Sequence, residues 1–201
     1  MNNAPTPEKS KKPIVRPIYE LIDWVEVFLT ALVTVILLFT FFFRIVVVSG
    51  SSMATTLQEG DYLILTNLGY TPRNGDVVVL RTTSYANGKK PLIKRVIATE
   101  GQWLDIDFET WEVRVGDTLE TMQPINEDYV YKLEGIDMEL AGARPEDFPM
   151  QIREGHVFVM GDNRNNSTDS RNPAIGQVSE NAVIGRAVFR LFPAQKMGAV
   201  D

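Results

Sequence analysis

The sequence predicts a mainly β domain that follows one membrane-spanning helix near the N-terminus. Two observations lead to this fold class. Residues 27–43 form a run of 17 uncharged, mostly apolar residues, whereas the chain beyond them alternates short β-rich runs with Gly and Pro turns. Convincing amphipathic helical patterns are scarce. The 201 residues are enough for one ordinary domain with an appendage.

The first residues of the chain predict a tail on one side of a membrane and an anchor across it. Residues 1–26 include four Lys or Arg and have little apolar surface to bury. Residues 27–43 reach only about 26 Å as a helix, but Ile45–Val48 after Arg44 bring the run near the ~20 residues that a bilayer requires. We therefore expect a cytoplasmic tail over 1–26 and a transmembrane anchor over 27–48.

Two other interpretations of the apolar run stay open. A buried core helix is one, although no face of the run is polar. A cleavable signal peptide is the other, although the run is long and Val46 and Val48 stand where small residues of a cleavage site are expected. The excess of Lys and Arg before the run predicts that the N-terminus lies in the cytoplasm. Residues 49–201 would then form an extracytoplasmic domain of a single-pass protein in the cell membrane.

Beyond the anchor, six runs have the composition of strands. They are residues 62–66, 76–81, 92–98, 112–115, 156–160 and 182–191. Residues 101–154 are the least predictable part of the domain, and we regard them as an acidic insert with 14 Asp or Glu against 4 Lys or Arg. A solvated acidic surface is the ordinary interpretation of such a segment, and a binding role is the alternative.

Composition excludes several classes of chemistry. The formal net charge of −6 argues against nucleic acid as the main partner. The absence of Cys excludes disulfides, thiolate metal sites and a Cys nucleophile, and the single His, His156, excludes a multi-His metal centre. No nucleotide-binding glycine loop is present, and no metal or organic cofactor is implied. Any hydrolytic chemistry therefore falls to Ser, Thr, Lys, Asp and Glu.

Three segments carry candidate reactive groups. Residues 49–57 hold a Gly-Ser cluster that is either a linker or part of a site. Residues 92–98 hold Lys94 in a β-branched run, where it lies either in solvent or in the core. Burial lowers the pKa of a Lys to roughly 5–6 in extreme cases, and a neutral Lys beside a Ser hydroxyl is a competent general base. Residues 161–171 are either a turn-rich loop that hydrogen-bonds to itself or part of a site.

Taken together and in this order, these segments resemble those of the type I signal peptidases, membrane-anchored serine proteases that use a Ser–Lys dyad. The resemblance covers nearly everything after the tail. Residues 161–171 match the family pattern Gly-Asp-Asn-Arg-x-x-Ser-x-Asp-Ser-Arg at every fixed position. Four further segments are similar to its other motifs: Ser52–Leu57, Gly75–Val78, Lys94–Ala98 and Gly185–Pro193. The length of the insert is more similar to the compact Gram-positive form of the family.

The resemblance implies a signal peptidase-like, mainly β fold and a role for each matched residue. Ser52 would be the nucleophile and Lys94 its general base, and Ser167 would hydrogen-bond and orient the Lys94 amine. Two ion pairs would support the site without carrying protons: Asp162 with Arg95, and Asp169 with Arg171. His156 matches no catalytic position of the family, so we expect it to be a strand or surface histidine.

Two positions depart from the family pattern. Thr55 replaces the Pro that usually follows Ser-Met-x, which removes no catalytic atom. Gly50 stands where some members place a Ser whose hydroxyl helps to hold the oxyanion, and many Gram-positive-type members also have Gly there. The oxyanion hole would then rest on the Ser52 N–H, with any second donor unidentified, and the loss of a used donor costs about 10²–10³ in rate. Met53 and Leu57 beside this loop would either face lipid or belong to the core.

The resemblance implies that the chain removes signal peptides from exported preproteins after small residues, in an Ala-x-Ala-like pattern. The bilayer would be a partner and the secretion translocon would be near. Other functions stay open. A specialised member would serve a few substrates such as pilin or conjugation precursors, and an inactive relative would bind signal segments without cutting them. A self-cleaving repressor protease shares the Ser–Lys chemistry, but it would need a DNA-binding domain, and this chain has an apolar run and an acidic balance instead.

Overall fold

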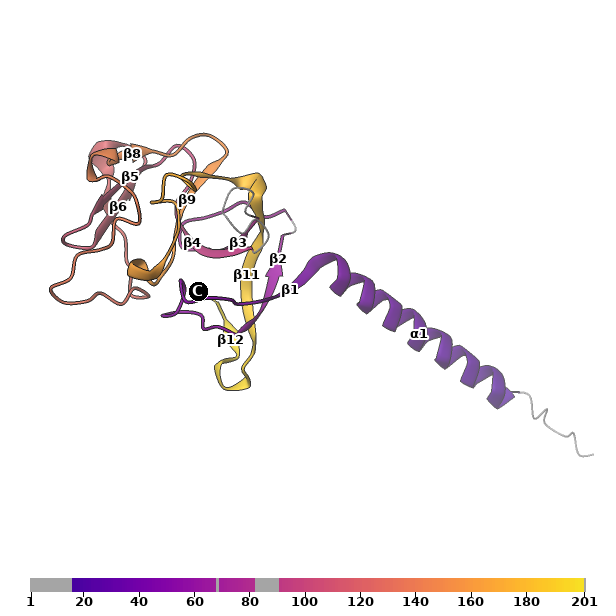
Figure 1. Cartoon of the computed structure of the whole chain (residues 1–201). Coiled ribbons are helices and arrows are strands. Elements are labelled where there is room, and N and C mark those ends of the chain that lie inside the picture. Colours follow the sequence, from indigo (N-terminus) through magenta and orange to yellow (C-terminus); the bar gives the residue numbers. More distant parts are fainter. Residues whose placement is uncertain (1–15, 68, 82–90, 201) are drawn as a thin grey trace, which may run out of the picture. The chain divides into compact units, whose positions relative to one another are not determined.

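The computed structural model describes residues 16–67, 69–81 and 91–200 of the chain. The chain divides into two compact units, Met1–Phe41 and Phe42–Asp201. The first contains the helix α1 and the second contains the β domain (Figure 1). The structure is mainly β, as the sequence predicts. The first fifteen residues of the predicted tail lie outside the described residues.

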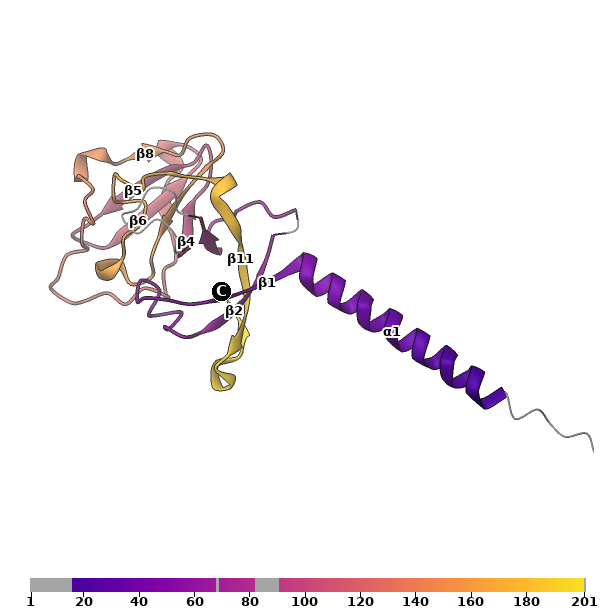
Figure 2. The ribbon, with the colours of Figure 1, turned by 45° about the vertical axis from the view of Figure 1, so that its right-hand side comes forward.

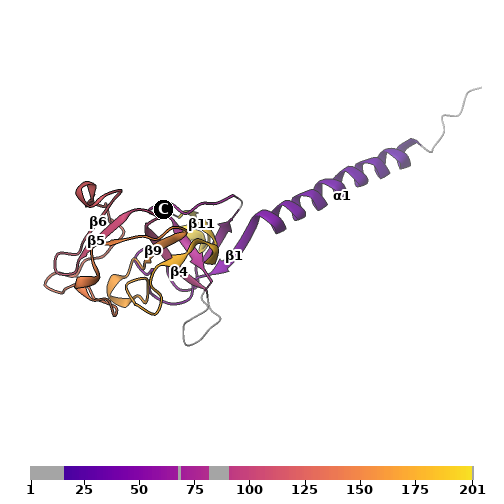
Figure 3. The ribbon, with the colours of Figure 1, turned by 90° about the horizontal axis from the view of Figure 1, so that it is seen from above.

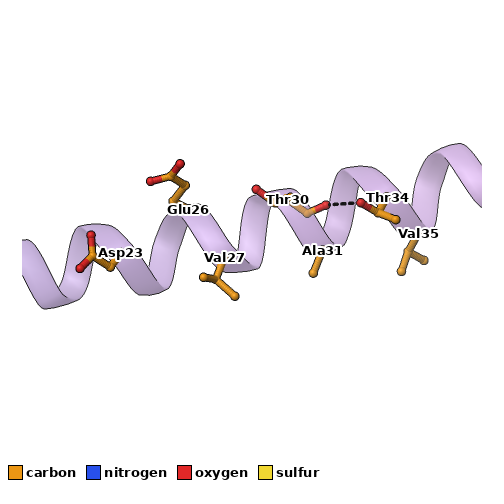
Figure 4. Close-up of a pocket in the computed structure, with 7 residues that line it drawn as sticks. All are labelled: Asp23, Glu26, Val27, Thr30, Ala31, Thr34 and Val35. Carbon is orange, nitrogen blue, oxygen red and sulfur yellow. Dashed lines mark hydrogen bonds between the residues drawn. The ribbon is translucent and has the colours of Figure 1, made fainter.

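The helix α1 spans Arg16–Phe42, so residues 16–26 of the predicted tail are helical. Its described apolar side chains are exposed. On the face shown in Figure 4, the Thr34 hydroxyl donates a 2.8 Å hydrogen bond to the Thr30 carbonyl oxygen, which satisfies the hydroxyl within the helix itself. Among the residues that the structure describes, no helix combines the length and the hydropathy that crossing a membrane requires.

The helix ends where a strand begins. The strand β1 (Phe43–Val47) pairs antiparallel with β2 (Tyr62–Thr66), and Val48 after it is buried in the core. These residues belong to the expected anchor, 27–48, and the structure differs from that expectation here. The β-branched residues Ile45–Val47 favour extended backbone, and the ladder to β2 satisfies backbone N–H and C=O groups that a helix would otherwise pair internally.

The β domain is built on an eight-stranded antiparallel sheet (Figures 1 and 2). Its strands follow the order β1-β2-β11-β3-β4-β9-β10, and β12 pairs with β11. The remaining bounds are β3 (Val77–Leu80), β4 (Leu92–Ala98), β9 (His156–Met160), β10 (Val178–Ser179), β11 (Val183–Phe192) and β12 (Gly198–Ala199). Five of the six predicted runs form strands of this sheet, which confirms the strand pattern over most of the domain.

The insert folds as a second antiparallel sheet at the end of the domain away from β1 (Figure 3). Its order is β7-β6-β5-β8. The bounds are β5 (Trp103–Asp107), β6 (Glu112–Gly116), β7 (Gln123–Pro124) and β8 (Met150–Gln151). Single-turn 3₁₀ helices in the described connections cover Leu119–Thr121, Pro145–Asp147, Arg164–Asn166, Glu180–Ala182 and Ala194–Lys196. The apolar face of the insert packs on Ile97 and Phe158, so it shares a core with β4 and β9.

A separate core cluster lies under the loop that follows β1. Met53 and Leu57 are buried in this cluster together with Val48, Leu63 and Val77. The lipid-facing alternative for Met53 and Leu57 is therefore wrong. Because both side chains are held in the core, the short turn between them has a fixed position in the domain.

We expect Leu57→Ala to lower the free energy of unfolding by about 2–5 kcal/mol, because it deletes a fully buried side chain and leaves a cavity. The measurement is urea unfolding of the whole chain in detergent, followed by tryptophan fluorescence. Leu119→Ala is the matched control, because Leu119 is 44% exposed. Equal losses in the two variants would contradict this account of the core.

Candidate active site

Ser52 and Lys94 meet at one point of the β domain. Ser52 lies in the turn that follows β1, and Lys94 lies within β4. The Lys94 Nζ lies 2.7 Å from the Ser52 Oγ, and it also donates a 3.0 Å hydrogen bond to the Ile93 carbonyl oxygen. The structure thus brings together two side chains that are 42 positions apart in the sequence.

Lys94 is buried because both faces of β4, a strand between β3 and β9, are covered. Only 2% of the residue is exposed, so the solvent-facing alternative for Lys94 is wrong. Burial lowers the pKa of Lys94 to about 8, while the carboxylates of Asp169 and Asp162 oppose the shift and the charge of Arg171 adds to it. About one tenth of the amine is therefore neutral at pH 7.

Arg95, the next residue of β4, forms the first predicted ion pair. Its Nε and Nη2 donate to the two carboxylate oxygens of Asp162 at 2.9 and 2.8 Å, and both side chains are buried. Asp162 also accepts a hydrogen bond from the Thr56 hydroxyl, and the Arg95 Nη1 donates to the Gly75 carbonyl oxygen at 2.8 Å. The pair therefore connects β4 to the turn that carries Ser52 and to the 161–171 loop.

Asp169 and Arg171 form the second predicted pair, and both are buried. The Arg171 Nε and Nη2 each donate to Asp169 at 2.9 Å, and the Gly161 N–H donates to the same carboxylate at 2.9 Å. Burial raises the pKa of Asp169, but the hydrogen bonds and charge of Arg171 outweigh it, and the pKa falls below its ordinary value. Arg171 also donates to the carbonyl oxygens of Glu139 and Arg164, at 2.7 Å each.

Gly161 is a point of close approach between the 161–171 loop and the dyad. A Cβ at Gly161 would lie 2.5 Å from the Ser52 carbonyl oxygen and would also meet the Ser167 Oγ. Ser167 is therefore brought beside the site. Among the described residues, however, the buried Ser167 hydroxyl makes no well-formed hydrogen bond, so the expected bond to Lys94 is absent from this structure.

The structure also shows the surroundings of three other residues singled out in the sequence. Gly50 has a φ of +94°, in the left-handed region that favours glycine, and it is exposed. The Thr55 side chain is also exposed. His156 begins β9, where its Nδ1 lies 2.7 Å from the Glu154 carbonyl oxygen, and within the described ranges it makes no hydrogen bond to Ser52 or Lys94.

Sequence reasoning missed three residues that surround the site. Arg164 lies in the matched motif without an assigned role, and it forms a buried ion pair with Glu127 of the insert. Tyr129, two residues further along the insert, stacks on Arg95 with its ring centroid 3.9 Å from the guanidinium carbon. The interpretation of the insert as a solvated acidic surface is therefore wrong for this part. Arg164 in the motif was the one signal for such an acid, because a buried Arg needs an acidic partner. The motif does not identify that partner.

The arrangement is suited to nucleophilic catalysis. A hydroxyl stands 2.7 Å from an amine whose pKa burial has lowered, which is the distance expected for a nucleophile and its base. Two buried, bidentate ion pairs flank the amine. In the part of the chain that the structure describes, no three Asp, Glu or His side chains converge as metal ligands would.

The chain is similar to known proteins over almost its whole length. A family model described as signal peptidase, peptidase S26, matches residues 21–192. A probable signal peptidase I-1 of Synechocystis sp. is 35% identical over 195 residues, which cover 92% of this chain and 90% of that protein. A signal peptidase I of Bacillus amyloliquefaciens is 32% identical over 198 residues, with 96% and 95% covered. A crystal structure of a signal peptidase I from Enterococcus faecalis aligns with a TM-score of 0.43 at 23% identity, covering 59% of this chain and 98% of that one.

We expect Gly161→Ala to lower the turnover of a peptide substrate by at least about 100-fold. The new Cβ would displace the Ser52 carbonyl and Ser167, and a shift of about 1 Å at reacting groups costs this much. Gly198→Ala is the matched control, because a Cβ there meets nothing within 4 Å. Full activity of Gly161→Ala in a folded protein would contradict the close approach.

Proposed function

The chain belongs to the signal peptidase family, peptidase S26, and we propose that it removes signal peptides from exported preproteins with Ser52 and Lys94 as its catalytic dyad. That it is a serine peptidase follows from the family and from the curated relatives. The dyad is supported chiefly by one observation: the Lys94 Nζ is buried and lies 2.7 Å from the Ser52 Oγ.

The proposed reaction begins with the neutral form of Lys94. The amine takes the proton of the Ser52 hydroxyl, and the Ser52 Oγ attacks the carbonyl carbon of the scissile peptide. The protonated Lys94 then donates its proton to the leaving amine, so that the peptide bond breaks and an ester to Ser52 remains. Water enters, loses a proton to Lys94 and releases the acyl group by the same steps in reverse.

Charge on the tetrahedral intermediate needs hydrogen-bond donors near the Ser52 backbone. The Ser52 N–H is available, because among the described residues it makes no hydrogen bond. Gly50 has no hydroxyl to contribute, in contrast to family members with a Ser at that position. The Ser52 N–H is therefore our one assigned oxyanion donor.

The substrate would lie beside the site as an extended strand, with alternate side chains entering shallow pockets. The family resemblance implies cleavage after small residues in an Ala-x-Ala-like pattern. Pockets of that size reject large side chains by overpacking. Substrates of this kind emerge at a membrane, so we also propose that the chain works close to the secretion translocon.

We assign residues 49–201 to the extracytoplasmic side, residues 27–42 of α1 to the membrane and the residues before them to the cytoplasmic side. The apolar composition of residues 27–43, the Lys and Arg before them and the exposed apolar side chains along the helix support this assignment. The β domain adds an apolar surface of its own, in which Tyr62, Phe192 and Met197 are 42%, 55% and 52% exposed. Apolar groups of this size at a surface are suited to contact with lipid. An anchored Ser52 would meet membrane-bound substrates at a raised effective concentration.

The full chain in detergent should cleave a purified preprotein at one site after a small-x-small sequence. Ser52→Ala and Lys94→Ala should each abolish the cut, because one removes the nucleophile and the other its base. Product size and the new N-terminus are measured by mass spectrometry. If the parent protein cuts none of several preproteins, a binding protein or a highly specialised relative is favoured. If Lys94→Ala cuts at the parent rate, the dyad is excluded.

The pH dependence should report the Lys94 base. Because the neutral amine is the working form, kcat/KM should rise with pH by about tenfold per unit below the pKa and level off above it. The midpoint should lie near the Lys94 pKa of about 8. Lys132→Ala, which removes an exposed lysine, should leave the midpoint unchanged. A rate that is flat or falls between about pH 6 and pH 9 would contradict a lysine base.

A further inference from the structure

The segment 127–129 of the acidic insert contacts two arginines that hold the backbone around the dyad. We propose that Glu127 and Tyr129 are positioning residues for Ser52 and Lys94, acting through Arg164 and Arg95. This inference rests on the proposed peptidase function and deepens it, because it gives the insert a part in the reaction. Neither residue touches the dyad itself.

Glu127 acts on the backbone of the loop that approaches Ser52. Its carboxylate pairs with both terminal nitrogens of Arg164, and the two side chains are 4% and 0% exposed. The Arg164 Nε then donates a 3.1 Å hydrogen bond to the Gly161 carbonyl oxygen. Gly161 is the residue whose backbone lies against the Ser52 carbonyl and Ser167. Glu127 therefore holds the Arg164 guanidinium in the position from which it bonds the Gly161 carbonyl oxygen.

Tyr129 acts on the strand that carries Lys94. Its ring covers the Arg95 guanidinium at 3.9 Å, while the edge of the same guanidinium is bonded to Asp162 and to the Gly75 carbonyl oxygen. A guanidinium has no hydrogen-bonding atoms on its faces, so an aromatic ring is the group that excludes water there. Arg95 is adjacent to Lys94 in β4, and its orientation limits the motion of that part of the strand.

The two contacts are one unit within the insert. The Tyr129 hydroxyl donates to Glu127 at 3.3 Å, and the Val130 N–H donates to the Glu127 carbonyl oxygen at 2.9 Å, which closes a turn over these residues. Farther along the insert, the Glu139 N–H donates to the Asn165 side-chain oxygen of the 161–171 loop at 2.8 Å. The insert thus holds the loop at more than one place, and a change in the turn is transmitted to both arginines.

Removal of the ring should affect the chemical step more than substrate binding. We expect Tyr129→Leu to lower kcat by about 3- to 30-fold with KM nearly unchanged, since these factors correspond to the range from an exposed to a desolvated cation–π contact. Water that reaches the site would relieve the burial of Lys94, which lies among Asp162, Asp169, Arg171 and Arg95. The midpoint of the pH profile would then move upward from the parent value.

The experiment compares Tyr129→Leu with four other variants of the full chain in detergent, and the thermal unfolding midpoint of each variant is recorded. Tyr129→Phe keeps the ring and should retain most of the parent kcat. Tyr131→Leu is the matched control, because Tyr131 belongs to the same insert and is 70% exposed. Glu127→Gln removes the buried charge and should lower kcat at least tenfold, whereas Glu134→Gln removes an exposed charge of the same insert and should not.

Loss of kcat in Tyr129→Leu and Glu127→Gln, with retention in the other three variants, supports the proposal. The proposal is overturned if Tyr129→Leu, Tyr129→Phe and Tyr131→Leu have equal kcat. It is also overturned if Tyr129→Leu and Tyr129→Phe lose kcat to the same extent. If the parent chain cuts the preprotein and Ser52→Ala does not, the proposed peptidase function stands, whatever these variants do. Failure of the parent chain to cut would instead contradict the proposed function.

Discussion

The site depends on keeping a lysine amine buried and partly neutral beside a serine. Burial lowers the pKa of Lys94 and the charge of Arg171 adds to this shift, but the carboxylates of Asp169 and Asp162 act against it. Each carboxylate is bonded bidentately to its own arginine, Arg95 or Arg171. A carboxylate paired in this way acts on the amine as a dipole rather than as a full negative charge, so its effect falls more steeply with distance. The ion pairs therefore let a low pKa persist among acidic groups.

Strand order explains how groups so far apart in the sequence reach this point. β4 lies between β3 and β9 with both of its faces buried, and the 161–171 loop leaves directly from the end of β9. The turn with Ser52 is held at its own position by Met53 and Leu57 in the core. Gly161 then permits the loop to pass against the Ser52 carbonyl without a side chain between them. The packing of these elements therefore sets the distance between Ser52 and Lys94.

Six of the twelve described strands of the β domain were predictable, because their β-branched runs end near Gly, Pro or Asn turns. β1 was not, since Phe43–Val47 continues the apolar composition of the helix before it and only its pairing with β2 marks it as a strand. Strand alternation could not decide the burial of Lys94, because β4 is buried on both faces. The Ser167 bond to Lys94 was implied by the family resemblance, and its absence here depends on side-chain geometry that a motif does not encode.

The insert shows why a count of charges does not locate them. Its excess of acids suggests a solvated surface, yet Glu127 is buried. The ion pairs of the site explain why an acid of the insert is buried. The 161–171 loop and β4 contribute three buried arginines, Arg95, Arg164 and Arg171, but only two buried aspartates, Asp162 and Asp169. A buried arginine without an anion is costly, so the third one requires an acid from elsewhere in the chain. The insert, which packs on β4 and β9, is the segment placed to supply it.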